Sequence, residues 1–192
     1  MGLGDGPGEW DDYEWFPTRG TRRPATATVV ADDGALAQQV LAEGLWVEHD
    51  APRILLVDLD NLRAGPQRWA ARMGAVVALA RQADHVVLAG QEGQVRRARP
   101  HLAEFVADAV TVPKGSDLAD VALLEAVDTL DLPDAQALVV SNDGIFAELA
   151  SCGPLVVLSP GRKALSAALA AAATRVLDLQ ELEHAASVPP ED

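Results

Sequence analysis

Cysteine is nearly absent from this sequence, since its 192 residues include only Cys152. One cysteine excludes an intramolecular disulfide and a zinc site built from four cysteines, and it is typical of proteins from a reducing compartment. An isolated cysteine usually packs as a small apolar residue, so we expect the side chain of Cys152 to be buried.

Aromatic residues are also scarce, at 4% of the chain, although hydrophobic residues of all kinds make up 49%. A core built from alanine, valine and leucine suits helices that pack on a sheet, which favours an α/β fold over a β-sandwich. The chain is long enough for one ordinary domain with a hydrophobic core of its own.

Long apolar runs are missing as well. No uninterrupted run approaches the roughly 20 residues that cross a membrane, and the alanine-rich stretch Ala164–Ala173 is too short. Met1–Gly8 has neither the basic nor the apolar part of a signal peptide. We therefore expect a cytoplasmic protein without a membrane partner.

Basic residues are outnumbered. The chain carries 15 Lys and Arg against 29 Asp and Glu, which gives a formal net charge of −14. This balance counts against nucleic-acid binding, because Lys and Arg supply most of the affinity for phosphates. Many arginines nevertheless fall in one half of the main domain: Arg53, Arg63, Arg68, Arg72, Arg81, Arg96, Arg97 and Arg99. Both a local basic face and ordinary solvated helix surfaces fit this distribution.

The composition divides the chain into a disordered acidic tail at residues 1–25, an N-terminal extension at 26–52, the main domain at 53–183 and a C-terminal tail at 184–192. The first tail is rich in glycine, proline and charge and shows no sustained period. Its aromatic and acidic segment Glu9–Phe16 could dock on a protein partner. In the extension we expect a short strand at Ala25–Val30 and a helix that Asp33 caps, running through Leu41 and ending at Gly44.

From Arg53 onward, apolar β-branched runs alternate with helical stretches. Runs such as Ile54–Val57 and Ala137–Val140 do not alternate with polar residues, which is typical of strands buried on both faces of a parallel sheet. The pattern predicts a three-layer, Rossmann-like α/β domain with a mainly parallel central sheet. The expected strands are Arg53–Asp58, His85–Ala89, Ala109–Val112, Ala137–Ser141, Leu155–Leu158 and Arg175–Leu177, and the expected helices are Pro66–Gln82, Gly93–Val106, Ser116–Thr129, Gly144–Ala150 and Lys163–Ala172.

Polar residues follow several of these strands, where ligands bind in such sheets. The segments are Val57–Asn61, Lys114–Asp120 and Ser141–Gly144. Taken singly, each is explained by helix caps and turns. All three are expected at the same edge of the sheet, however, which would bring Asp58, Asp117 and Asp143 into one cleft. Carboxylates placed so close together repel one another unless a cation binds them.

Oxygen ligands of this kind are preferred by Mg²⁺ or Mn²⁺. Asp60 and Asp120 are further candidate ligands, and Asp120 comes one helical turn after Asp117. A solvent-facing position for Asp120 remains open. Zinc is disfavoured, because the histidines are dispersed along the chain: His49, His85, His101 and His184.

The same segments resemble those of NYN domains, which are relatives of PIN domains. Ile54–Leu62 resembles the opening strand of that family, Lys114–Asp117 its Lys-x-x-Asp motif, and Val139–Phe146 its late Ser-Gly-Asp-Ser-Asp-Phe motif. The resemblance covers about Arg53 to Leu179. It implies a metal-dependent ribonuclease. The chain departs from the family at Asn142, which replaces a glycine, and at Ile145, which replaces a second late aspartate and puts two-metal catalysis in doubt.

These residues predict hydrolysis of an RNA phosphodiester by a metal-activated water. Asp58, Asp117 and Asp143 would hold the cation, with Asp60 and Asp120 as secondary ligands. The remaining candidates would orient water or contact the substrate through hydrogen bonds and charge: Asn61, Ser141, Asn142, Arg63 and Lys114. RNA is the expected partner, and a homodimer is not excluded.

Two alternatives remain open. One is a catalytically inactive NYN-like module that binds RNA or a protein, which the missing late aspartate and the acidic net charge favour. The other is a phosphatase of the haloacid dehalogenase type. Asp58 and Asp60 resemble its nucleophile and acid, Ser141 its second motif and Lys163 its later lysine, with late acids among Asp178, Glu181 and Glu183.

Overall fold

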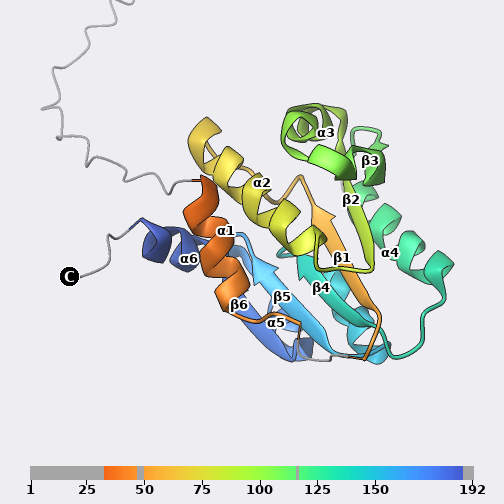
Figure 1. Cartoon of the computed structure of the whole chain (residues 1–192). Helices are drawn as coiled ribbons and strands as arrows, with labels where there is room; N and C mark the ends of the chain where they lie inside the picture. Colours follow the sequence, from red (N-terminus) through yellow and green to blue (C-terminus); the bar gives the residue numbers. More distant parts are fainter. Residues whose placement is uncertain (1–32, 47–49, 116, 188–192) are drawn as a thin grey trace, which may run out of the picture.

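The computed structural model describes residues 33–46, 50–115 and 117–187. At its centre lies a parallel sheet of six strands in the order β3-β2-β1-β4-β5-β6. Figure 1 shows the sheet between two sets of helices. The strands are β1 (Arg53–Asp58), β2 (His85–Gln91), β3 (Ala109–Val112), β4 (Gln136–Val140), β5 (Leu155–Ser159) and β6 (Arg175–Asp178).

Helices cover both faces of the sheet. One layer contains α1 (Asp33–Ala42), α2 (Pro66–Ala80), α3 (Glu92–Ala98) and α6 (Leu179–Ala186). The opposite layer contains α4 (Leu118–Leu130), α5 (Ala167–Ala172) and the 3₁₀ helix η3 (Gly144–Ser151). Shorter 3₁₀ turns are η1 (Arg99–His101), η2 (Ala103–Asp108) and η4 (Arg162–Ala164). This arrangement confirms the predicted three-layer, Rossmann-like α/β fold.

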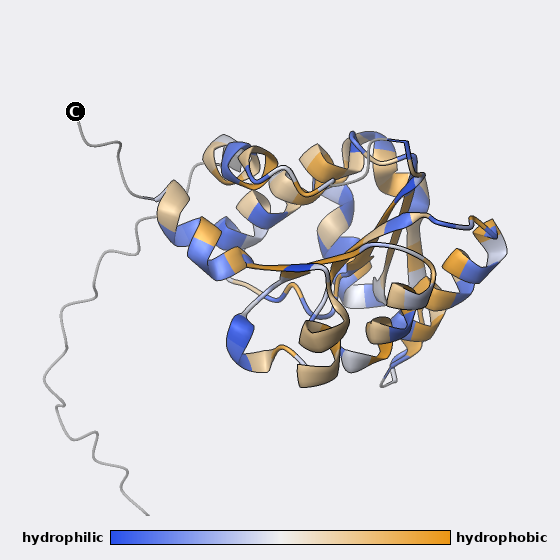
Figure 2. Ribbon diagram, turned by 90° about the horizontal axis from the view of Figure 1, so that it is seen from below, coloured by the Kyte–Doolittle hydropathy of each residue, from blue (hydrophilic) through white to orange (hydrophobic). Residues whose placement is uncertain are grey.

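The sheet separates two hydrophobic cores. In β1, Leu55 and Val57 pack into the core under α1, α2 and α6, whereas Ile54 and Leu56 pack into the core under α4 and η3. Figure 2 shows the strands coloured as hydrophobic along most of their length. Successive strand residues point to opposite faces, so Asp58, at the end of β1, belongs to the α4 side. That side is where the acidic residues of the second and third polar segments lie.

The six strands predicted from Arg53 onward are confirmed, with ends that differ by no more than two residues from those expected. Two predicted helices are interrupted. The helix expected at Gly93–Val106 ends at Ala98 and continues as separate 3₁₀ turns, because Pro100 has no N–H to donate. The helix expected at Lys163–Ala172 is split into η4 and α5. The short helix expected after β4 is the 3₁₀ helix η3.

Both ends of the described chain contribute to the fold. The helix expected from Asp33 is present as α1. It ends at Ala42, and Gly44, just beyond it, has a positive φ of 58°. Its residues Leu36 and Val40 are fully buried against α2 and α6. Helix α6 is absent from the predicted elements and runs into the segment 184–192 that was expected as a tail. The expected strand at Ala25–Val30 and the first tail lie outside the described residues.

One burial prediction is wrong. Cys152 is exposed, because it follows η3 on the outer surface instead of packing into either core. Within the described segments, none of the helices combines the length and the apolar character needed to span a bilayer.

Candidate metal centre

The polar segments meet where the strand order reverses. From β1 the sheet continues through β2 and β3 on one side and through β4, β5 and β6 on the other. The connections that leave β1 and β4 therefore diverge, and the crevice between them is the usual ligand site of a doubly wound sheet. Asp58 closes β1, and Asp143 follows β4 by three residues. The chain from β3 to α4 brings Asp117 to the same edge.

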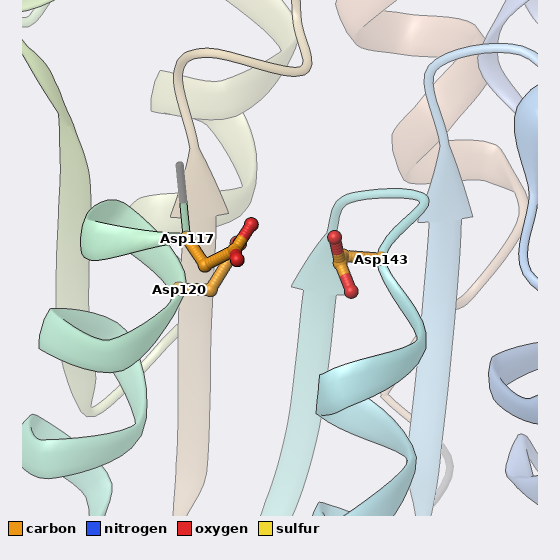
Figure 3. A group of neighbouring side chains, drawn as sticks. All are labelled: Asp117, Asp120 and Asp143. Atoms are coloured by element: carbon orange, nitrogen blue, oxygen red, sulfur yellow. The ribbon is translucent and has the colours of Figure 1, made fainter. Parts of the chain in front are cut away.

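Three aspartates converge at this point and form what we call the acidic cluster: Asp117, Asp120 and Asp143. One carboxylate oxygen from each lies within 4.8 Å of the others. Figure 3 shows Asp117 and Asp120 approaching from the start of α4, and Asp143 approaching from the loop beyond β4. Residues three apart lie on the same side of a helix, which explains why the side chains of Asp117 and Asp120 lie close together.

Asp120 is the most deeply placed member of the acidic cluster. The residue is only 6% exposed, yet its Oδ1 atom has no hydrogen-bond partner in the described part of the chain. A buried polar atom without a partner is costly and rare in folded proteins. The sequence left open whether Asp120 faces solvent or the cleft, and the structure places it facing the cleft. An ion bound by the cluster would give this oxygen a partner.

Asp117 does not serve as an ordinary helix cap. It precedes α4 with a φ of 61°, in the left-handed region that non-glycine residues seldom adopt. Its side chain accepts no capping hydrogen bond from the described residues of α4, and the residue is exposed. Strained backbone of this kind is concentrated at functional sites. The carboxylate of Asp117 is thus left available to a ligand.

Asp143 has a second role. Its Oδ1 atom accepts a hydrogen bond from the N–H of Ile145 at 3.1 Å, so the residue caps η3. Its own N–H donates to Ser141 Oγ at 3.2 Å. The cap does not remove the Asp143 carboxylate from the acidic cluster, because the two roles are compatible.

Asp58 lies beneath the acidic cluster and is 1% exposed. Its Oδ1 accepts hydrogen bonds from the N–H groups of Asp60, at 2.9 Å, and Asn61, at 3.3 Å. Its Oδ2 accepts from Ser141 Oγ at 3.1 Å and from the side-chain amide of Asn61. Burial raises the pKa of Asp58, and these hydrogen bonds act in the opposite direction. Asp58 is not one of the three converging aspartates, but it lines the same pocket and its side chain interacts with that of Asp120 through charge and a hydrogen bond. In the structure it also ties together the loops after β1 and β4.

Asp60, in the loop after β1, is held by a hydrogen bond to the end of β2. Its Oδ2 accepts a hydrogen bond from the N–H of Gln91 at 3.2 Å, while its Oδ1 is buried without a partner among the described residues. This loop lies close against β2, since a Cβ on Gly90 would stand 2.9 Å from the Cβ of Leu59. Asp60 also stands outside the acidic cluster, although it lines the same pocket.

The acidic cluster opens into a pocket of about 240 Å³, which we call the acidic pocket. Its lining includes Asn61, Arg63 and Gly115 as well as the five aspartates already described. Arg63 is exposed and donates from Nε to the backbone oxygen of Asp60 at 3.1 Å. Arg63 is thus the predicted substrate contact that the structure does place at this pocket.

Two predicted substrate contacts lie outside the acidic pocket. Lys114 is exposed and lines a separate pocket of about 530 Å³ at the ends of β2 and β3. Asn142 is buried, accepts a hydrogen bond from Ser159 Oγ at 2.6 Å and faces a larger groove over β5. Ser141 is fully buried and acts through Asp58.

The charge state of Asp120 is sensitive to pH. Burial, together with the negative charges of Asp58, Asp143 and Asp117, raises the pKa of Asp120 to about 7. In the metal-free protein a proton therefore relieves the repulsion within the acidic cluster at and below neutral pH. A divalent cation would compete with that proton.

This competition gives a measurable result. We expect Mn²⁺ to bind about tenfold more weakly at pH 6 than at pH 8, because a proton must leave Asp120 before the cation binds. Isothermal calorimetry in two buffers of different ionisation enthalpy measures both the affinity and the proton release. Equal affinities at the two pH values, with no proton released at pH 6, would contradict the assignment of Asp120 as a ligand.

The structure also contains a buried ion pair that the sequence analysis did not identify. Arg72, on α2, and Glu183, on α6, pair at 2.6 Å between Nε and Oε1, with side-chain exposures of 2% and 9%. The signal in the sequence was an arginine on an apolar helix face, between Trp69 and Met73. The pair lies behind the groove over β5 and not in the acidic pocket.

Comparisons with known proteins add little to this geometry. No protein-family model matches the chain, and no curated protein matches it. Among solved structures, the chain is similar to a protein of unknown function from Vibrio parahaemolyticus, with 17% sequence identity and a TM-score of 0.48. The similarity covers 71% of this chain and 99% of that one. The function therefore has to be inferred from the site itself.

Proposed function

We propose that this chain is a metal-dependent ribonuclease, in which Asp117, Asp120 and Asp143 hold a Mg²⁺ or Mn²⁺ ion. The observation that carries the proposal is the convergence of three carboxylates, one of which, that of Asp120, has a buried oxygen without a hydrogen-bond partner among the described residues. Carboxylate oxygens alone suit these two cations. RNA as the substrate follows from the resemblance of the three polar segments to NYN domains.

The surrounding residues suit this chemistry. A bound cation would lower the pKa of a coordinated water and neutralise charge on the phosphoryl oxygens. Asp58, through its hydrogen bonds with Asn61 and Ser141, fixes the loop after β4 that carries Asp143, and so acts as a positioning residue. The guanidinium group of Arg63 lies at the pocket and can contact a phosphate.

Ile145 stands where the family often has a late aspartate, and it is 36% exposed. Asp120 supplies the third carboxylate from a different element, the first turn of α4. We infer that Asp120 compensates for the missing residue. One cation is the number that this ligand set supports.

The phosphatase alternative receives less support. A nucleophilic aspartate needs an accessible carboxylate oxygen, but Asp58 is 1% exposed and both of its oxygens accept hydrogen bonds. Of the late acids, Asp178 caps α6 and Glu183 pairs with Arg72. These engagements favour the nuclease over an aspartyl-phosphate mechanism.

The test is cleavage of a labelled single-stranded RNA by the purified chain with Mn²⁺, with Mg²⁺ and with EDTA. We expect cleavage that requires the cation and that falls by about 100-fold or more in Asp143→Asn, because a lost ligand weakens both metal binding and charge neutralisation. The matched control is Asp128→Asn, which changes an exposed residue farther along α4.

Three results would decide between the alternatives. Cation-dependent cleavage that Asp143→Asn removes supports the nuclease. Hydrolysis of a small phosphate ester with an aspartyl phosphate on Asp58 would instead support the phosphatase. If calorimetry detects no Mn²⁺ binding up to millimolar concentration, the inactive binding module stands and the nuclease proposal is wrong.

A further inference from the structure

A larger groove of about 1050 Å³ adjoins the acidic pocket, and we call it the β5 groove. It lies over the loops that follow β1, β4, β5 and β6, between α2 and α6. Asp60, Asn61 and Arg63 line both the β5 groove and the acidic pocket, so the two are direct neighbours. A ligand that occupied the acidic pocket could therefore extend into the groove.

Basic residues gather along this groove. Arg63, Arg162 and Lys163 line it and are exposed. Arg162 pairs with Glu181 at 3.9 Å, but both side chains are about two-thirds exposed, and such pairs are weak. Lys163 forms no ion pair with any described residue. Five Lys and Arg against three Asp and Glu line the groove, whereas the whole chain has 15 against 29.

The loop that carries two of these cations is held in place. Asp178 Oδ2 accepts the N–H of Arg162 at 3.0 Å, and Gln180 donates to the backbone oxygen of Pro160 at 3.2 Å. The loop packs so closely against the side chain of Gln180 that a Cβ on Gly161 would lie 2.6 Å from its Nε2 atom. Arg162 and Lys163 are thus presented on a fixed backbone, which lowers the entropy lost on binding an anion.

The lining of the groove favours phosphates over bases. No tryptophan, tyrosine or phenylalanine is among the described residues that line it. Proteins that read single-stranded bases stack them on aromatic rings, whereas phosphate contacts come from arginine and lysine and carry no sequence information. The deeper arginines, Arg68 and Arg72, are held by Glu183, so the exposed cations remain for a ligand.

We propose that the β5 groove is a second substrate subsite, which binds the backbone phosphates of single-stranded RNA next to the bond cut at the acidic pocket. Arg63, Arg162 and Lys163 are its phosphate contacts. The inference rests on the proposed function for its substrate class. It adds the direction in which the strand leaves the site, over the ends of β4 and β5, and a binding mode that is independent of sequence.

The test measures binding without cleavage. A fluorescein-labelled single-stranded RNA of mixed sequence is titrated in EDTA at several salt concentrations and followed by anisotropy. For the double variant Arg162→Ala with Lys163→Ala, the slope of log K against log salt should become shallower by about 1.4, which corresponds to roughly 25-fold weaker binding at 0.1 M salt. In the cleavage assay the same variant should raise KM and leave kcat unchanged.

The matched control removes the same charge at the opposite edge of the sheet. Arg53 opens β1 and Arg81 follows the end of α2, so Arg53→Ala with Arg81→Ala should leave the salt slope unchanged. Thermal unfolding of both variants checks that they are folded.

The outcomes separate the two proposals. If the groove variant binds RNA like the unmodified chain, or if the unmodified chain binds no RNA at low salt, the groove inference is wrong, whatever the cleavage assay shows. If binding is lost in the groove variant but the unmodified chain cuts no RNA with Mn²⁺, the groove still binds RNA phosphates, but the nuclease proposal fails and with it the role of the groove as a substrate subsite.

Discussion

Asp120→Asn is expected to abolish Mn²⁺ binding and at the same time to make the metal-free protein more stable at pH 8. The two effects have one cause. Burial and the charges of Asp58, Asp143 and Asp117 disfavour the ionised form of Asp120. The neutral amide of asparagine removes that repulsion, and its N–H can donate to a neighbouring carboxylate. The substitution also removes the negative charge of a buried carboxylate that a divalent cation needs as a ligand.

The pH dependence of the stability follows from the direction of the shift. The pKa of Asp120 is raised from 3.8 to about 7 on folding. The folded state therefore loses stability as pH rises from about 4 through 7, because the unfolded chain releases this proton first. Asp120→Asn should raise the melting temperature at pH 8 in EDTA and have almost no effect at pH 4.

Calorimetry and thermal unfolding in EDTA and in excess Mn²⁺ make the comparison. Saturating Mn²⁺ should stabilise the unmodified protein, by about 2.7 kcal/mol at 100 times the dissociation constant. The variant should gain nothing from the cation. Asp128→Asn, on the same helix, should behave like the unmodified protein in every condition. A variant that melts at a lower temperature at pH 8 in EDTA, or that still binds Mn²⁺, would refute the role of Asp120.

Glu183→Gln is expected to lower the free energy of unfolding by about 3–5 kcal/mol, since it leaves the buried guanidinium of Arg72 without a counter-charge. Arg72 also donates to the backbone oxygens of Leu62, at 3.2 Å, and Pro160, at 3.3 Å. The ion pair thus joins α2 and α6 to the loops after β1 and β5. Urea denaturation at neutral pH measures the loss.

Two comparisons separate the buried charge from the change in shape. Glu104→Gln removes an exposed partner of Arg81 and should leave the urea midpoint nearly unchanged, because solvent screens that pair. Replacing both members, Arg72→Met with Glu183→Leu, should lose less stability than Glu183→Gln alone. If Glu183→Gln unfolds at the same urea concentration as the unmodified chain, the pair contributes nothing to the fold.

The sequence predicted the layers of this fold well, because unbroken apolar runs such as Ile54–Val57 are sufficient to indicate strands buried on both faces. It predicted helix boundaries less well. Pro100 was visible as an interruption of a helix. Asp178 was visible as a cap for α6, and its Oδ1 accepts a hydrogen bond from the N–H of Gln180 at 2.8 Å. The signal at Pro100 was outweighed by the helical pattern on both sides of it, and Asp178 was considered only as a late acid of the phosphatase alternative.

The candidate site could be predicted only in outline. The sequence placed Asp58, Asp117 and Asp143 at one edge of the sheet, but Asp120 takes the place among the converging carboxylates that Asp58 was expected to fill. Asp58 differs because Ser141 and Asn61 donate to it, and these contacts come from loops that only the folded sheet brings together. The β5 groove was not predictable for the same reason, since Arg63 and Lys163 are distant in sequence.

The acidic cluster stands outside both hydrophobic cores, on loops and on the first turn of α4. Its members contribute little apolar contact, so exchanging one of them removes no core packing, although Asp143 also caps η3. On the proposed function, a single altered carboxylate would stop the reaction while the fold persisted, so that chemistry and architecture could change independently.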